Sequence, residues 1–178
     1  MVLLGLCSPG WQATIRRLGG SMIRCIQHFS FTVSNLEEAI HFFSDILGLE
    51  ATPIIEVRDE LTAKVVGMPG VWLRGSFMLT PGNGTIELIQ YVTPKGERID
   101  LNTCNVGVAH ISFEVDDIEE MYKDLIAKGV KFVSPPVWGK KGVLKGRGSC
   151  YLKGPDGITL EFNQIPKGVK VHPATGFV

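Results

Sequence analysis

Two short motifs of this chain each occur twice, and each copy places a residue capable of metal chemistry at the same point. Residues 28–33 are His-Phe-Ser-Phe-Thr-Val, and residues 110–115 are His-Ile-Ser-Phe-Glu-Val. Residues 85–90, Thr-Ile-Glu-Leu-Ile-Gln, are matched by residues 159–164, Thr-Leu-Glu-Phe-Asn-Gln, and a turn with proline and glycine precedes both. A repeat of this kind predicts two copies of one supersecondary unit.

The metal-ligand types within these motifs are His28, Glu87, His110 and Glu161. Two imidazoles and two carboxylates suit a hard or borderline divalent cation, with water or a substrate oxygen in the remaining positions. A single histidine or glutamate on a strand is more often structural or exposed, and that alternative stays open for each residue alone. Their equivalent positions in the two repeats favour one shared metal site.

Hydrophobic spacing predicts the elements that position these residues. Residues 26–33 alternate between polar and apolar with a period of two, which predicts a half-buried strand with His28 on its polar face. A helix then opens at Ser34, three residues before Glu37 as in a capping box, and ends at Gly48. Strands are expected near 50–57, 71–80 and 85–92.

The second half of the chain repeats this order. The pattern predicts a strand over 108–115, a helix from Asp116 or Asp117 to about Lys128, a loop over 135–148, and strands near 131–134, 147–153 and 158–164. The expected fold class is α+β, with two βαβββ modules forming a curved mixed sheet and the helices outside. The four candidate ligands would then line the concave side.

The predicted domain organisation follows these elements. It comprises an N-terminal extension at 1–21, a first module at 22–92, a linker at 93–107, a second module at 108–166 and a tail at 167–178. Breaks between segments are expected where hydrophobic periodicity gives way to polar, proline-containing or glycine-containing stretches.

Composition limits the classes of function. The 178 residues are 44% hydrophobic and 20% charged with a net charge of zero, so neither nucleic acid nor an anionic membrane is an expected partner. No apolar run reaches the roughly 18 residues of a membrane span. The cysteines show no Cys-x-x-Cys pairing, which favours reduced thiols in a cytoplasmic protein.

The motifs resemble the vicinal oxygen chelate superfamily, which includes glyoxalase I, methylmalonyl-CoA epimerase, extradiol dioxygenases and bleomycin-resistance proteins. The resemblance covers about residues 24–166, and the stretch from Gly146 to Glu161 is similar to the family's last hairpin. It implies the two-module fold and one divalent metal ion (Ni, Co, Zn, Mn or Fe) at the four candidate ligands. The ligand set is closest to glyoxalase I-like members, which use His or Gln, Glu, His and Glu.

The resemblance also implies a reaction. It points to a metal-dependent lyase or isomerase of the glyoxalase I type, lactoylglutathione lyase-like, which forms an enediolate from a hemithioacetal or thioester with Glu161 or Glu87 as base. A methylmalonyl-CoA epimerase-like isomerase, an extradiol-type dioxygenase and a metal-free ligand-binding resistance protein stay open, because fold does not fix function. Glu87 as a fourth ligand counts against the dioxygenase, which uses two His and one Glu.

Candidate substrate contacts are Arg74, Arg147 and Tyr91. The substrate would be a small molecule, such as a glutathione or CoA adduct, and basic residues would meet the glycyl carboxylate of glutathione; solvated loop charges are the alternative. Tyr91 is a candidate for lining the pocket, although aromatic residues on strands more often lie in a core or interface. The resemblance further implies a homodimer, because family members often bring modules of two chains together.

Overall fold

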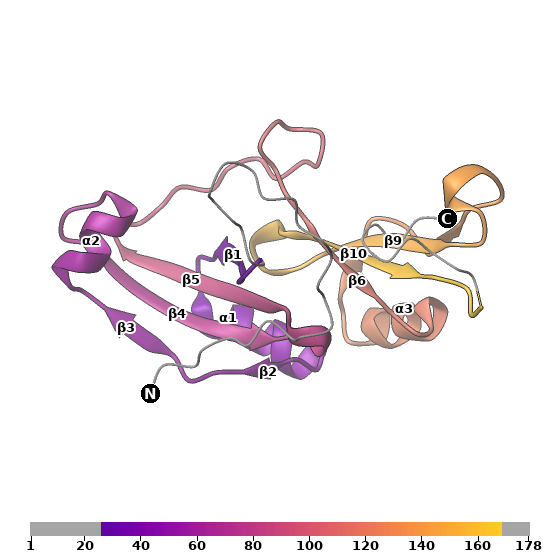
Figure 1. The fold of residues 1–178 in the computed structure, drawn as a ribbon, viewed down its shortest axis with the longest axis horizontal. Coiled ribbons are helices and arrows are strands. Elements are labelled where there is room, and N and C mark those ends of the chain that lie inside the picture. Colours follow the sequence, from indigo (N-terminus) through magenta and orange to yellow (C-terminus); the bar gives the residue numbers. More distant parts are fainter. Residues whose placement is uncertain (1–25, 169–178) are drawn as a thin grey trace, which may run out of the picture. The chain divides into compact units, whose positions relative to one another are not determined.

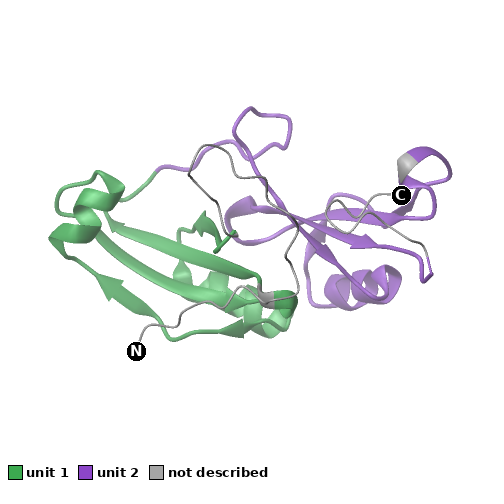
Figure 2. Cartoon of the chain, viewed as in Figure 1, with its two compact units in different colours: residues 1–96 green, residues 97–178 purple. Residues whose placement is uncertain are grey.

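The chain divides by its contacts into two compact units, Met1–Gly96 and Glu97–Val178, here called the first and second modules (Figure 2). The computed structural model describes residues 26–168. The expected extension at 1–21 and most of the expected tail at 167–178 lie outside this range, and the domain boundaries stay predictions. Within the described range, no helix has the length and apolar character needed to cross a membrane.

The first module contains a five-stranded mixed sheet (Figure 1). Its strands are β1 (Phe29–Thr32), β2 (Glu50–Ala51), β3 (Ile55–Val57), β4 (Trp72–Leu79) and β5 (Thr85–Thr93). The order is β1-β5-β4-β2, with β3 also paired to β4. β1 runs parallel to β5, and the other pairs are antiparallel.

The second module has the same topology in its own five-stranded sheet. Its strands are β6 (Ile111–Glu114), β7 (Lys131–Phe132), β8 (Val137–Trp138), β9 (Gly148–Lys153) and β10 (Thr159–Gln164). The order is β6-β10-β9-β7, with β8 also paired to β9, and β6 runs parallel to β10. The predicted α+β class with repeated mixed-sheet modules is confirmed.

In each module, prolines interrupt the chain segment that pairs with the central strand β4 or β9. Pro53 lies between β2 and β3, and Pro135 and Pro136 lie between β7 and β8. Proline has no backbone N–H to donate to the ladder, so it interrupts pairing with the neighbouring strand. The strand predicted over 50–57 is therefore broken, and the segment predicted as a loop over 135–148 contains β8.

The helical elements are α1 (Leu36–His41), the π-helical turn η1 (Phe42–Ile46), α2 (Glu60–Val66), α3 (Ile118–Ala127) and the 3-10 turns η2 (Pro81–Asn83), η3 (Gly142–Leu144) and η4 (Pro155–Gly157). Asn35 caps α1 through a bond from the Glu38 N–H, so the cap predicted at Ser34 is wrong by one residue. Asp117 caps α3, as one of the two predicted alternatives. The sequence pattern does not predict α2, none of whose side chains is buried.

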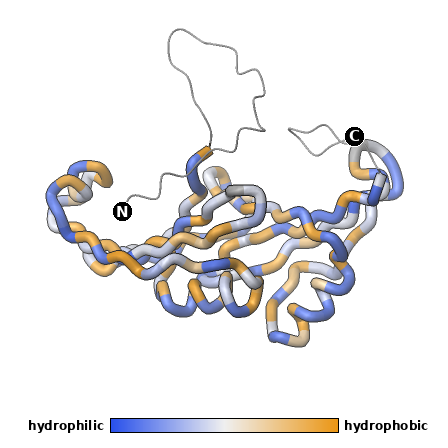
Figure 3. Tube along the Cα trace, turned by 60° about the horizontal axis from the view of Figure 1, so that its bottom comes forward, coloured by the Kyte–Doolittle hydropathy of each residue, from blue (hydrophilic) through white to orange (hydrophobic). Residues whose placement is uncertain are grey.

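The core of each module lies between one face of its sheet and a helix, which is α1 with η1 in the first module and α3 in the second. Residues of that core are 0–2% exposed and include Leu36, Phe43, Met78, Ile86 and Leu88 in the first module and Ile118, Leu125, Leu152, Leu160 and Phe162 in the second. Hydrophobic and hydrophilic stretches are interspersed along the chain trace (Figure 3). The opposite face of each sheet carries the repeated histidine and glutamate, and we call it the ligand face.

In each module, one glutamine stabilises the turn between the first strand and the helix that follows it, here called the strand–helix corner. In the first module, Gln90 Nε2 donates to the carbonyl oxygen of Ser34 at 2.8 Å. In the second, Gln164 Nε2 donates to the carbonyl oxygen of Asp116 at 2.8 Å, and Gln164 Oε1 accepts from the Ile118 N–H at 3.0 Å. These bonds give a structural reason for the glutamine that ends both copies of the second motif.

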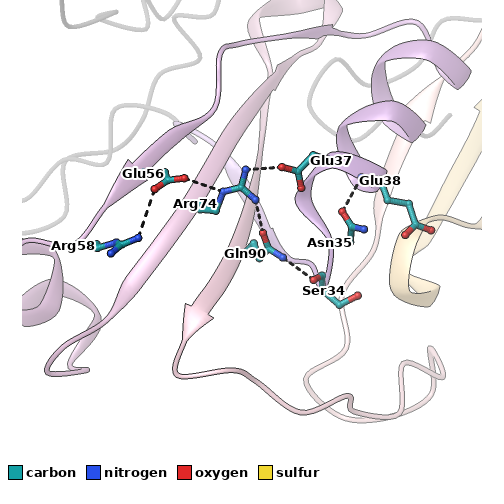
Figure 4. A network of polar contacts seen from close by, with 8 residues as sticks. All are labelled: Ser34, Asn35, Glu37, Glu38, Glu56, Arg58, Arg74 and Gln90. Atoms are coloured by element: carbon teal, nitrogen blue, oxygen red, sulfur yellow. Dashed lines mark hydrogen bonds and ion pairs between the residues drawn. The ribbon is translucent and has the colours of Figure 1, made fainter.

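Arg74 ties the start of α1 to the sheet of the first module (Figure 4). From the core-facing side of β4, its guanidinium donates to Glu37 Oε1 at 2.5 Å and to Gln90 Oε1 at 3.1 Å. Arg74 Nε also lies 3.3 Å from Glu56 Oε1 of β3. The guanidinium therefore connects two strands and the first turn of the helix.

The second module makes the same connection with a tryptophan. Gly148 stands where the first module has Arg74, and a Cβ added there would lie 3.0 Å from Trp138 Cη2. Trp138 donates from Nε1 to Glu119 Oε1 at 2.9 Å, and Glu119 is the repeat equivalent of Glu37. An acidic residue in the first helical turn is thus shared, whereas its partner differs between modules.

Replacing Gln164 by alanine is expected to lower the free energy of unfolding by about 1–2 kcal/mol, because two backbone groups at the start of α3 lose their partner. Denaturant titration of the full chain measures this change. Lys123→Ala, at an exposed position on α3, is the control. A loss no larger than in the control would contradict the role of the glutamine.

Replacing Arg74 by methionine is expected to lower Tm by a few degrees at neutral pH. The hydrogen bond from Arg74 holds the pKa of Glu37 below its ordinary value of 4.5. Stability from this bond is therefore present above the ordinary pKa and is lost as pH falls through the lowered pKa of the folded state. Calorimetry should show a Tm difference that shrinks below pH 4.5.

Lys64→Met, which removes an exposed cation from α2, is the matched control for this change. Its Tm should stay close to that of the wild type, because Lys64 lies in a helix whose side chains are not buried. A Tm difference for Arg74→Met that is independent of pH would show that the ion pair with Glu37 contributes nothing.

Candidate functional site

The first histidine–glutamate pair lies on the ligand face of the first module. His28 directly precedes β1, and the parallel pairing of β1 with β5 places Ser30 beside Glu87. His28 and Glu87 therefore share a face, with His28 Nε2 at 3.2 Å from Glu87 Oε2. The other ring nitrogen of His28 is hydrogen-bonded to the side-chain oxygen of Gln27, and the ring meets Phe77 edge-on.

The second pair repeats this arrangement. His110 directly precedes β6, and the parallel pairing of β6 with β10 places Ser112 beside Glu161. His110 Nε2 lies 3.3 Å from Glu161 Oε2. The ring of Tyr151, on β9, lies 5.2 Å from the His110 ring between centroids. Each module thus brings together two of the four predicted ligands.

The two pairs have the donor chemistry of a metal centre. Their histidines are 36% and 37% exposed and their glutamates 21% and 19%, so both pairs are reachable from solvent and equally so. An imidazole nitrogen and a carboxylate oxygen are suitable ligands for a divalent cation. No group of three or more His, Cys, Asp or Glu in residues 26–168 is placed to hold a metal ion, so the union of both pairs in one site stays a prediction.

Around the matched pairs, the two ligand faces differ in polarity. Where the ligand face of the first module has apolar residues or glycine, the equivalent positions of the second module have polar residues. The equivalent positions are Leu73 and Arg147, Gly75 and Ser149, Phe77 and Tyr151, Leu79 and Lys153, and Ile89 and Asn163. The pairs themselves are common to both modules, whereas their surroundings are particular to each.

The three predicted substrate contacts lie on different faces. Tyr91 is half-buried on β5, on the same face as Glu87, and Arg147 is half-buried directly before β9, on the same face as Glu161. Arg74 lies on the core-facing side of β4, where its contacts are structural. All three roles stay predictions. Only Tyr91 and Arg147 of the three lie on a ligand face, where a substrate contact is expected.

Asn163 is a ligand-face residue that the sequence analysis missed. It is 3% exposed, and its side chain bonds to three others: Oδ1 accepts from Arg147 Nε at 2.9 Å and from Ser149 Oγ at 2.5 Å, and Nδ2 donates to Ser112 Oγ at 2.5 Å. A signal was available, because Asn163 lies two residues after Glu161 and period-two alternation puts both on one face.

Burial and nearby charge set the protonation of two residues of β9. Burial, followed by the negative charge of Glu161, raises the pKa of the Tyr151 phenol. Burial, with smaller effects of Glu119 and Glu161, raises the pKa of Cys150 to about 11. At neutral pH, Tyr151 therefore keeps its O–H donor, and the Cys150 thiol is not a reactive thiolate.

Comparisons with known proteins agree with this fold. The family model described as Glyoxalase/Bleomycin resistance protein/Dioxygenase superfamily matches residues 25–162. A 2-epi-5-epi-valiolone epimerase from an Actinomyces species is 25% identical over 154 residues, which cover 84% of each chain. The mitochondrial methylmalonyl-CoA epimerase of Dictyostelium discoideum is 26% identical over 116 residues, which cover 62% of this chain and 60% of that protein.

A solved structure extends the agreement to three dimensions. The crystal structure of a glyoxalase family protein from Bacillus cereus is 26% identical and has a TM-score of 0.69, covering 83% of this chain and 98% of its own. The family match spans most of the chain and includes both histidine–glutamate pairs. The chain therefore belongs to the Glyoxalase/Bleomycin resistance protein/Dioxygenase superfamily, which confirms the resemblance found in its motifs.

Proposed function

We propose that this protein is a metal-dependent isomerase of the epimerase type, which moves a proton at the carbon next to a carbonyl group of a small molecule. The observation that carries the proposal is the equivalent contact in both modules, His28 to Glu87 at 3.2 Å and His110 to Glu161 at 3.3 Å. Two relatives at 25% and 26% identity are named as epimerases, which supports this reaction class within the superfamily.

The donor atoms support one divalent ion, such as Ni, Co, Zn, Mn or Fe, held by His28, Glu87, His110 and Glu161. In each pair the atoms that face each other are imidazole Nε2 and carboxylate Oε2, which are ordinary ligand atoms. Gln27 binds the second nitrogen of His28, an outer contact that would fix its ring. When bound, the ion would polarise the substrate carbonyl and stabilise negative charge on its oxygen.

The two glutamates supply the proton transfer in this proposal. Glu161, the preferred base, takes the proton from the α-carbon onto a carboxylate oxygen, and the electron pair of the C–H bond moves toward the carbonyl oxygen. Glu87 would relay a proton from solvent to the opposite side of the carbon, which inverts the centre. Exchange with solvent then restores the starting protonation of both carboxyl groups.

A lyase of the glyoxalase I type is the second candidate. The set His28, Glu87, His110 and Glu161 is the one that the resemblance assigns to glyoxalase I-like members. This reaction begins with the same proton abstraction, from a hemithioacetal, but returns the proton to the neighbouring carbon. The two candidates therefore share the glutamate chemistry and differ in substrate and in the site of reprotonation.

We also propose a homodimer and a cytoplasmic location. A homodimer follows from the behaviour of the superfamily, whose members often bring modules of two chains together. The cysteines in the described part of the chain, Cys104 and Cys150, are free thiols, which fits a cytoplasmic location. Neither is needed for the chemistry proposed for the two glutamates.

Metal content tests the four-ligand site. The full chain, purified without chelators or a His tag, should hold about one divalent ion, the stoichiometry of a single four-ligand centre. His110→Ala and Glu161→Gln should each weaken ion affinity by roughly 10- to 100-fold or more, because each removes a ligand. Glu114→Gln, which removes another carboxylate from the ligand face of β6, is the matched control. Elemental mass spectrometry after dialysis gives the ion count.

Two results would replace the proposal. Wild-type protein without an ion, even after Ni, Co, Mn, Fe and Zn are added back, would leave a metal-free binding protein on this fold. Bound iron together with oxygen-dependent turnover of catechols would identify a dioxygenase.

Deuterium exchange tests the base. In D2O the protein should introduce deuterium at the α-carbon of methylmalonyl-CoA or during conversion of the methylglyoxal–glutathione hemithioacetal. Glu161→Gln, at saturating metal, should slow exchange by about 10²- to 10⁴-fold, the usual contribution of a general base. Glu114→Gln should exchange at the wild-type rate. Equal rates in the wild type and in metal-loaded Glu161→Gln would assign the proton transfer to another residue.

A further inference from the structure

The second module buries an amide on its ligand face where the first module has an aliphatic side chain. Asn163 is 3% exposed, and the repeat places Ile89 at the same position of the first module. A buried amide is costly unless its polar atoms are paired. Asn163 bonds to three side chains of the ligand face: Arg147, Ser149 and Ser112. The fold itself accepts a branched aliphatic residue here, so the amide serves something other than the sheet.

The main consequence of these bonds is a fixed guanidinium. Asn163 Oδ1 accepts from Arg147 Nε at 2.9 Å, and this bond orients the plane of the guanidinium. Ser149 and Ser112 in turn hold the amide in the orientation that presents Oδ1 to Arg147. The first module has Leu73 in place of Arg147, so the bonded pair of Arg147 and Asn163 occurs only at the second module's copy of these positions.

The chemistry of this face suits an anion. A planar guanidinium matches the two oxygens of a carboxylate or phosphate in a paired geometry, and orientation in advance reduces the entropy lost on binding. The lysines of the preceding loop differ from Arg147, because Lys140, Lys141 and Lys145 are exposed.

We infer that Arg147, held in place by Asn163, binds an oxyanion of the substrate on the ligand face that carries the His110–Glu161 pair. The inference rests on the proposed function, which puts the reacting carbon at that pair. Asn163 is then a positioning residue that acts through Arg147. The substrate class follows: a carbonyl compound that bears a carboxylate or phosphate group.

Anion binding by the full chain tests this inference. Malonate and inorganic phosphate are titrated separately by calorimetry into the wild type, Arg147→Gln, Asn163→Ile and the double variant. The wild type should bind at least one anion saturably, and Arg147→Gln should weaken it by about 10-fold or more, the scale of a lost charge-assisted hydrogen bond. Stronger binding of malonate would assign a carboxylate, and stronger binding of phosphate would assign a phosphate.

The positioning role has its own readout. Asn163→Ile introduces the residue that the first module has at this position. It should weaken the affinity for the anion by about 3- to 10-fold, the scale of one hydrogen bond. The double variant should bind no more weakly than Arg147→Gln alone, because Asn163 acts through the arginine. Arg147→Lys keeps the positive charge but lacks the Nε–H that donates to Asn163, so it should also weaken anion binding. This variant serves as the test if Asn163→Ile does not fold.

Lys123→Gln, which removes an exposed cation from α3, controls for net charge and should bind as the wild type does. No saturable binding of either anion, or equal affinity in the wild type and Arg147→Gln, would overturn the inference. These outcomes are separate from those of the proposed function, because metal content and deuterium exchange report on the histidine–glutamate pairs. Anion binding without a metal would uphold the Arg147 site and reject the isomerase.

Discussion

The parallel pairing of the first and last strands of each module is the constraint on which the ligand positions depend. The register aligns Ser30 with Glu87 and Ser112 with Glu161, and it brings a histidine just before the first strand to the same face. A shift by one residue would turn either glutamate into the core and separate it from its histidine. That shift is opposed from the other side of the sheet, where the residues after the glutamates, Leu88 and Phe162, are 0% and 1% exposed. Packing of the core therefore determines where the ligands stand.

The sequence predicts the parts of this arrangement that depend on periodicity and repetition. Alternation places His28, Glu87, His110 and Glu161 on the non-core faces, and repetition makes them equivalent. The structure adds that each histidine lies beside the glutamate of its own module. Other features depend on contacts that no local pattern contains. The interruption at Pro53 depends on the pairing of β2 and β3 with β4, and α2 has no buried stripe to produce a helical period. The hydrogen bond between Asn163 and Arg147 joins β10 to the start of β9, and it cannot be predicted until the register of these strands is known.

Comparison of the modules separates what the fold requires from what one module alone uses. Both modules keep the corner glutamine, Gln90 or Gln164, because each corner has a carbonyl that needs a donor. Both also connect the first helical turn to the sheet, but Arg74 does so in one and Trp138 in the other. These are alternative solutions to one structural requirement. Polar differences on the ligand faces have no such explanation, because the sheet is complete with either side chain.

A proton transfer that distinguishes the two sides of a carbon needs a substrate held in one orientation. The four proposed ligands cannot supply that orientation, because the first module offers the same imidazole and carboxylate as the second, at nearly the same separation. Orientation has to come from positions at which the modules differ. Arg147 against Leu73 and Asn163 against Ile89 are two such differences in polarity on the ligand faces. An anionic group on the substrate would recognise the second module through Arg147, whereas the equivalent position of the first module holds the apolar side chain of Leu73.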